Sequence, residues 1–161
     1  ICGRASALLE AFGRDYERDV GRLPWTTVHG DFHFWNVLYR GDEVIAIVDF
    51  DFLQERERLF DVAYALRYVI EHVRTLAGSA AVDPSRLDWA SVRLWIDLYD
   101  QNAPFPLTPA ERARLPSELL RVFLVALTTA ARQDDPARAM CAMSELFDLC
   151  AWIAAHPELF A

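Results

Sequence analysis

One short stretch of this chain differs in pattern from all the rest and limits the folds that the chain can adopt. Residues 37–52 are rich in β-branched and aromatic side chains, and Arg40-Gly41-Asp42 interrupts them in the manner of a turn. The pattern predicts one β-hairpin, with strands at roughly 37–39 and 44–48. No other segment has a convincing strand pattern, so the alternating strands and helices of a parallel sheet are excluded.

Outside this stretch, apolar residues recur at helical spacing. The spacing predicts a first helix over the first twenty residues, ending near Gly21, and it predicts four more helices after the hairpin, around 59–73, 92–99, 119–127 and 143–153. Thr108 and Glu111 form a capping box, which predicts a short additional helix that ends before Pro116. We therefore expect an α+β fold that is mostly α, with one embedded hairpin, in a single domain over residues 1–161.

Composition excludes several functions. All 16 basic residues are arginine, and the 24 acidic residues leave a net charge of −8. Without lysine there is no Walker A loop and no lysine Schiff base, and the acidic excess argues against nucleic-acid binding. Three cysteines without a CxxC pair indicate neither a disulfide framework nor a cysteine-rich zinc site. No apolar run approaches the roughly 18 residues of a membrane span, and no secretion leader is visible, so we expect a cytoplasmic protein.

Polar residues concentrate at the two ends of the predicted hairpin. His29-Gly30-Asp31 and Asn36 precede it, and Asp49-Phe50-Asp51 follows it. Because a hairpin brings its ends together, Asn36 and Asp49 should lie side by side. Their amide and carboxylate oxygens suit a hard cation such as Mg²⁺. Asp31, five residues before Asn36, should face the same cavity as a candidate proton acceptor.

These two motifs, in this order and with a strand pair between them, resemble the catalytic region of small-molecule kinases of the aminoglycoside phosphotransferase and choline kinase type. These enzymes are relatives of the protein kinases, whose H-R-D-x-x-x-x-N and D-F-G motifs occupy corresponding places. The resemblance covers residues 28–66 well. It implies the helical C-terminal lobe of a protein-kinase-like fold, and an enzyme that transfers a phosphoryl group to a hydroxyl of a small molecule.

The resemblance also implies roles for individual residues. Asp31 would orient the acceptor hydroxyl and take its proton. Asn36 and Asp49 would hold Mg²⁺ on the phosphates of ATP or GTP, and Asp51 would add a second metal contact. His33 lies where relatives carry a basic residue near the transferring phosphate, so it is a candidate donor there.

Four further features are interpreted as structural. His29 would fix the catalytic loop, and Asp61 would brace that loop from the next helix. For Trp35 we favour packing under the loop over lining the acceptor pocket. The alternating charges of 55–58 favour a solvated helix start.

Two other functions remain open. In an extended segment, His29, Asp31 and His33 would project to one face and could bind the zinc of a hydrolase. That hypothesis explains neither Asn36 nor the Asp49-Phe50-Asp51 motif. The other possibility is a non-catalytic kinase-like binding module.

The predicted partners follow from the kinase interpretation. The chain lacks a glycine-rich loop and the phosphate-pairing lysine, and the resemblance places both in an N-terminal lobe before Ile1. We expect that lobe to be a partner, the isolated chain to be inactive, and a small-molecule hydroxyl compound to be the acceptor. Without the lobe, apolar side chains that include Phe50 and Phe52 should be uncovered, which predicts a homodimer through the cleft face. We expect neither nucleic acid nor membrane as a partner.

Overall fold

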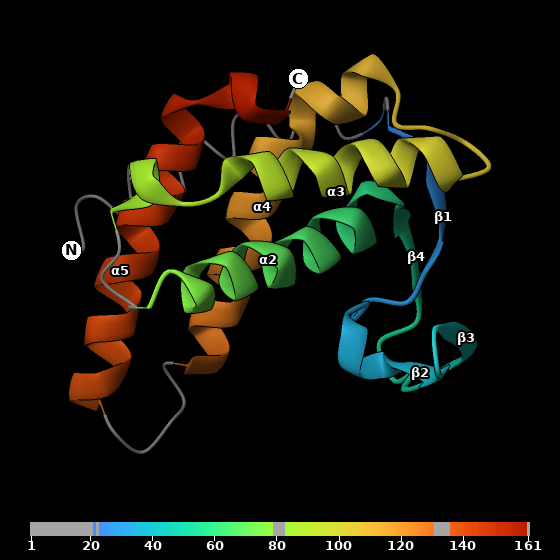
Figure 1. The fold of residues 1–161 in the computed structure, drawn as a ribbon, viewed down its shortest axis with the longest axis horizontal. Helices are drawn as coiled ribbons and strands as arrows, with labels where there is room; N and C mark the ends of the chain where they lie inside the picture. The colour runs from blue at the N-terminus through green and yellow to red at the C-terminus, as the bar shows by residue number, and fades with distance from the viewer. Residues whose placement is uncertain (1–20, 22, 79–82, 131–135, 161) are drawn as a thin grey trace.

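The computed structural model of this chain describes residues 21, 23–78, 83–130 and 136–160 (Figure 1). Within these residues the fold is α+β and mostly α, as the sequence predicts. The helices are α2 (Leu59–Leu76), α3 (Trp89–Asn102), α4 (Pro109–Ala130) and α5 (Pro136–Ala155). The strands are β1 (Trp25–Val28), β2 (Val37–Arg40), β3 (Glu43–Ile47) and β4 (Gln54–Glu57). The short 3₁₀ turns are η2 (Phe34–Asn36), η3 (Pro84–Arg86) and η4 (Pro157–Phe160).

The predicted hairpin is confirmed as β2 and β3. The strands pair antiparallel with Val37 opposite Ile47, and Gly41 in the turn has a φ of +61°. A positive φ is readily adopted by glycine and only rarely by other residues, so the turn residue agrees with the turn geometry. In Figure 1 the hairpin extends away from the helices at one end of the molecule.

A second small sheet was not predicted, and it corrects the interpretation of 55–58. β1 pairs antiparallel with β4, with Trp25 opposite Glu57 and Val28 opposite Gln54. The predicted solvated helix start is therefore wrong, since this segment is a strand and Glu57 is only 2% exposed. The strand forms because the backbone of β1, which is distant in sequence, supplies its hydrogen-bond partners. A charged strand of this kind has no apolar alternation to reveal it.

The four helices predicted after the hairpin are confirmed, and they bury one apolar core. α2 contributes Leu59, Leu66 and Ile70, all fully buried, and packs against both α3 and α4. Figure 1 shows α2 and α3 running beside each other, with α4 crossing behind them and α5 along one side. The helix predicted over the first twenty residues lies outside the described residues.

The helix predicted to end before Pro116 is instead the start of α4, which runs through that proline to Ala130. A proline inside a helix removes a hydrogen bond and costs about 3 kcal/mol. The neighbours Leu115 and Leu119 are fully buried in the core, and this packing offsets the cost. The capping box is confirmed, because the Thr108 N–H donates to Glu111 Oε2 (2.8 Å) and the Glu111 N–H donates to Thr108 Oγ1 (3.2 Å).

Among the described helices, none combines the length and the apolar character that crossing a membrane requires.

Candidate active site

The loop that follows β1 is shaped by Gly30. This residue has a φ of +83°, and a Cβ built on it would lie 2.2 Å from the carbonyl oxygen of Phe52. Any other residue would meet both an unfavourable backbone conformation and a backbone clash. Glycine therefore lets the loop that carries Asp31 lie directly against the segment that follows the hairpin.

Asp61 attaches the same loop to α2. Its carboxylate accepts hydrogen bonds from the backbone N–H groups of His29 (2.7 Å) and Gly30 (2.9 Å). Asp61 lies in the first turn of α2, where a negative charge interacts favourably with the helix dipole. Because α2 is part of the buried core, these two bonds connect the loop to the most constrained part of the molecule. This is the contact that a bracing role requires.

The His29 ring connects the two motifs. Its Nδ1 accepts a hydrogen bond from the Asp31 N–H (3.3 Å), so Nε2 carries the proton and donates to the Val48 carbonyl (2.9 Å). The ring packs against Phe50 with centroids 4.9 Å apart, and only 7% of the residue is exposed. His29 thus holds the loop against the far end of the hairpin.

The zinc-hydrolase interpretation does not fit this geometry. Both ring nitrogens of His29 already have hydrogen-bond partners, and the positive φ of Gly30 breaks the extended conformation that would align the three side chains. Within the part of the chain that the structure describes, no cluster of three or more histidine, cysteine, aspartate or glutamate side chains is placed to hold a metal.

Asp31 and Asn36 are in direct contact. The Asn36 Nδ2 group donates to the Asp31 carbonyl oxygen (3.0 Å) and lies 3.4 Å from Asp31 Oδ2. The Val48 N–H donates to the Asn36 carbonyl oxygen (2.9 Å), which brings the next residue, Asp49, to the side of Asn36. The structure therefore brings Asn36 into contact with Asp31 and places the backbone of Asp49 next to Asn36.

Asp49 has a φ of +67°, the one positive φ outside glycine among the described residues. A side chain in this region costs of order 1–3 kcal/mol, and such residues gather at functional sites. The strain at Asp49 marks the end of the hairpin as a place where orientation of a carboxylate matters more than local stability.

The donor set suits a hard cation. The nitrogen of the Asn36 amide is engaged by Asp31, which leaves the amide oxygen as the candidate ligand atom of Asn36, and the carboxylate of Asp49 is the second candidate ligand. Oxygen ligands of these two kinds are those that Mg²⁺ prefers. Asp51 lies two residues further on, exposed, in the turn after the hairpin.

His33 faces Asp31 from the other side. Its Nε2 lies 3.5 Å from Asp31 Oδ2, and its ring packs against Tyr68 and Trp35 with centroid distances of 4.6 and 5.6 Å. Trp35 is 66% exposed, so the interpretation that it packs under the loop is wrong. The 3₁₀ turn η2 carries Phe34 and Trp35 outwards, and the rings lie on the surface beside the site.

Sequence reasoning missed Tyr64. Burial, and a hydrogen bond between its hydroxyl and Asp31, raise the pKa of Tyr64. The hydroxyl therefore stays protonated and is a further partner of the Asp31 carboxylate. Its position gives a usable signal, since Tyr64 follows Asp61 by three residues, one turn along α2.

Comparison with known proteins agrees with the geometry. A family model described as the phosphotransferase enzyme family matches residues 3–95, a range that includes the loop, the hairpin and all of α2. The chain belongs to the phosphotransferase enzyme family. The resemblance drawn from the two motifs is thereby confirmed, and the protein is a phosphotransferase by family. No curated protein and no solved structure matches the chain.

Proposed function

We propose that this phosphotransferase moves the γ-phosphoryl group of ATP or GTP to a hydroxyl group of a small molecule. The observation that carries the proposal is the hydrogen bond from Asn36 to Asp31. It lies near Asp49, whose backbone has a positive φ. In this proposal Asp31 is the proton acceptor, and Asn36 and Asp49, at the two ends of one hairpin, supply oxygen ligands for a cation. Phosphoryl transfer requires this combination, because its catalysis depends mainly on positioning and on neutralising charge.

In this proposal Asp31 orients the acceptor hydroxyl and takes its proton. The acceptor oxygen forms a bond to the γ-phosphorus, the bond from that phosphorus to the bridging oxygen breaks, and ADP or GDP leaves. A carboxylate is a weak base at neutral pH, so placing the hydroxyl in line contributes more than proton affinity. Contacts from Asn36, His33 and Tyr64 keep the carboxylate in position.

Asn36 and Asp49 would hold Mg²⁺, with Asp51 near enough in sequence to add a ligand. When bound, the ion neutralises charge on the nucleotide phosphates. His29 and Asp61 hold the loop backbone, and His33 keeps its predicted role as a donor near the transferring phosphate.

We further propose that a nucleotide-clamping lobe completes the enzyme. The sequence contains no lysine, so the phosphate-pairing lysine of kinases must come from outside this chain. Large apolar side chains on the hairpin and just after it are 42–60% exposed, namely Leu38, Tyr39, Val44, Ile45, Ile47, Phe50, Phe52 and Leu53. Such a patch supports a covering partner. In this proposal the clamping lobe covers it, and a second copy of the chain pairs with it when the lobe is absent.

The test uses the complete kinase, including the clamping lobe, with ATP and GTP compared over a panel of small-molecule alcohols. Asp31→Asn should lower turnover by about 10²–10⁴-fold while nucleotide binding persists. Asp49→Ala should abolish Mg²⁺-dependent nucleotide binding. Asp42→Asn, which makes the same change in the exposed hairpin turn, serves as the matched control and should leave both properties unchanged.

Two outcomes would contradict the proposal. Retained turnover in Asp31→Asn would remove the role assigned to that carboxylate. Tight nucleotide binding by the unaltered kinase, with no transfer to any acceptor of the panel, would favour the non-catalytic binding module.

A further inference from the structure

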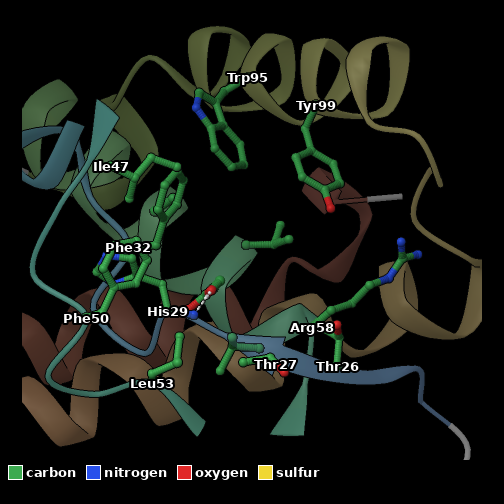
Figure 2. A pocket seen from close by; sticks show the side chains of 14 residues that line it. Thr26, Thr27, His29, Phe32, Ile47, Phe50, Leu53, Arg58, Trp95 and Tyr99 are labelled. Atoms are coloured by element: carbon green, nitrogen blue, oxygen red, sulfur yellow. Dashed lines mark hydrogen bonds between the residues drawn. The ribbon is translucent and has the colours of Figure 1, made fainter. Parts of the chain in front are cut away.

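A cavity of about 450 Å³ adjoins the catalytic loop, and Asp31 is not among the residues that line it. Figure 2 shows the arrangement: Trp95 and Tyr99 extend from α3 on one side, Thr26 and Thr27 lie on β1 opposite, and Phe32, Ile47 and Phe50 close one end. The volume lies within the roughly 300–1,000 Å³ of typical small-molecule sites. The cavity is therefore large enough for a ligand of its own.

The lining is mainly apolar and aromatic. Besides His29, its lining includes the aromatic residues Phe32, Phe50, Trp95 and Tyr99, and Val62 and Ala65 of α2 form an aliphatic wall. The rings of Trp95 and Tyr99 are nearly parallel, at 19°. The two rings stack on each other with centroids 6.0 Å apart and form one aromatic side of the cavity. An aromatic lining favours a flat aromatic ligand, because ring contacts add to the gain from apolar burial.

Two lining side chains, Arg58 and Asp61, are ionisable, and both already have partners: Arg58 is paired with Glu111, and Asp61 is hydrogen-bonded to the loop backbone. Arg58 donates to both carboxylate oxygens of Glu111 (2.7 Å each) and to the carbonyl oxygens of Phe105 (2.7 Å) and Pro106 (2.8 Å). Asp61 accepts from the two backbone N–H groups of the loop. A charged ligand would lose its hydration and would have to compete with these existing partners for Arg58 or Asp61. The cavity therefore selects an uncharged molecule, and the hydroxyls of Thr26 and Tyr99 offer it hydrogen bonds at the wall.

The cavity also adjoins the bonds that hold the catalytic loop. His29 and Asp61 line it, and the hydrogen bond between the His29 N–H and Asp61 is drawn at its edge in Figure 2. A ligand in the cavity would exclude water from these bonds. A hydrogen bond shielded from water is stronger and opens less often.

We propose that this cavity is a second binding site, specific for an uncharged, flat aromatic molecule with a polar edge, and that its occupancy stabilises the loop of His29 and Gly30. Binding in this cavity requires neither a nucleotide nor phosphoryl transfer. A failure of this proposal would therefore leave the proposed function untouched, and a failure of the proposed function would leave this proposal untouched.

The test uses 2-naphthol, an uncharged fused-ring phenol at neutral pH, with the purified 161-residue chain. Equilibrium dialysis measures binding, and hydrogen exchange measures protection of the His29 and Gly30 amides. We expect saturable binding. At a free probe concentration about nine times Kd, exchange of these two amides should slow about tenfold, because the probe binds only the closed loop.

Two variants and a control locate the site. Ala65→Phe fills the cavity from α2 and should abolish binding. Should that variant fail to fold, Trp95→Leu removes a ring from the opposite wall and should weaken binding at least tenfold. Leu94→Ala changes the neighbouring exposed position on α3 (56% exposed) and should bind like the unaltered chain. Absence of saturable binding, equal binding in the cavity variants and the control, or unchanged exchange of the two amides in the saturated chain would each overturn the proposal.

Discussion

The two small sheets of this molecule differ in how they are held together. The hairpin β2–β3 joins neighbouring strands through a tight turn, and most of its large apolar side chains are exposed. The sheet β1–β4 joins segments distant in sequence and ends in the core, where Val28 and Glu57 are each only 2% exposed. A local turn is sufficient for the first sheet, whereas the second depends on the packing of the helices around it.

The candidate active site lies where the two sheets meet. β1 leads into His29 and Asp31, and the ends of the hairpin carry Asn36 and Asp49. The hydrogen bonds from His29 to Val48 and from Asn36 to Asp31 join one sheet to the other. The site thus combines one element attached to the core with one that is exposed.

The largest expected effect concerns the attachment of β1–β4 to the core. Arg58 follows β4, its N–H donates to the Pro24 carbonyl (3.0 Å), and its guanidinium pairs with the fully buried Glu111. Glu111→Ala would leave this cation unpaired, and removing one partner of a buried pair costs about 3–5 kcal/mol. Urea unfolding measures the loss of stability.

Glu43→Ala, on the exposed hairpin strand β3, is the matched control, and its free energy of unfolding should stay within about 0.5 kcal/mol of that of the unaltered chain. Equal losses in both variants would show that the two sheets are equally attached.

The same pair should make stability depend on pH. Desolvation raises the pKa of Glu111, but hydrogen bonds from Arg58 and Thr108 outweigh it and hold the folded-state pKa below the ordinary value of 4.5. The carboxylate therefore stabilises the fold above about pH 4.5, and this contribution is lost as the pH falls through the folded-state pKa. In unfolding measured over a range of acidic pH, the stability difference between the unaltered chain and Glu111→Gln should shrink on acidification. A constant difference would contradict the assignment.

Two of the glycines with positive φ, Gly30 and Gly41, give an intermediate and sharper comparison. Gly30→Ala, after β1, places a Cβ 2.2 Å from the Phe52 carbonyl oxygen, whereas a Cβ at Gly41, in the hairpin turn, would meet nothing within 4 Å. Gly41→Ala should therefore cost only the roughly 1–2 kcal/mol of the left-handed backbone. Gly30→Ala should cost more than that and, if the proposed function holds, should also abolish turnover of the kinase that includes the proposed clamping lobe.

Denaturant unfolding and a transfer assay separate these two glycine variants. Gly41→Asn serves as a further control, because asparagine tolerates the left-handed region, and it should be nearly as stable as the unaltered chain. A smaller loss in Gly30→Ala than in Gly41→Ala would show that the loop yields around the added methyl group.

The smallest effect on stability is expected on the hairpin surface. Val44 is 55% exposed, so Val44→Thr should change the free energy of unfolding by no more than about 0.5 kcal/mol. The same change should reduce pairing of the isolated chain, because it makes the proposed contact face more polar. Light scattering at high concentration measures the pairing. A strictly monomeric unaltered chain would contradict the proposed homodimer, and a large stability loss would mean that the hairpin packs more tightly than its exposure indicates.

Local chemistry was sufficient to predict much of this fold. The turn at Gly41, the apolar spacing of the helices and the capping box of Thr108 and Glu111 each depend on residues close in sequence, and each is present. The approach of Asn36 to Asp49 follows from the same hairpin, because antiparallel strands return the chain to its starting point.

The errors share one physical cause. β4 is a strand of charged residues that forms only because β1 supplies its hydrogen bonds, and α4 continues through Pro116 because buried leucines on both sides of the proline compensate for it. Trp35 lies exposed because a short 3₁₀ turn, not its own apolar character, sets its direction. In each case the conformation or exposure of the residue was set by a backbone partner, a packing contact or a turn that the apolar pattern of the sequence does not show.

The sequence by itself determined the family, the mostly helical class and the hairpin, and it supplied the residues that we propose carry phosphoryl transfer, because motifs and periodicities are properties of neighbouring residues. Only the tertiary structure decided that Asp61 holds the loop backbone, that Tyr64 contacts Asp31, that Glu111 fixes Arg58, and that an aromatic cavity adjoins the loop. These features join residues from separate elements. Their energies depend on distances that are set when the helices pack together, and no spacing along the chain encodes such distances.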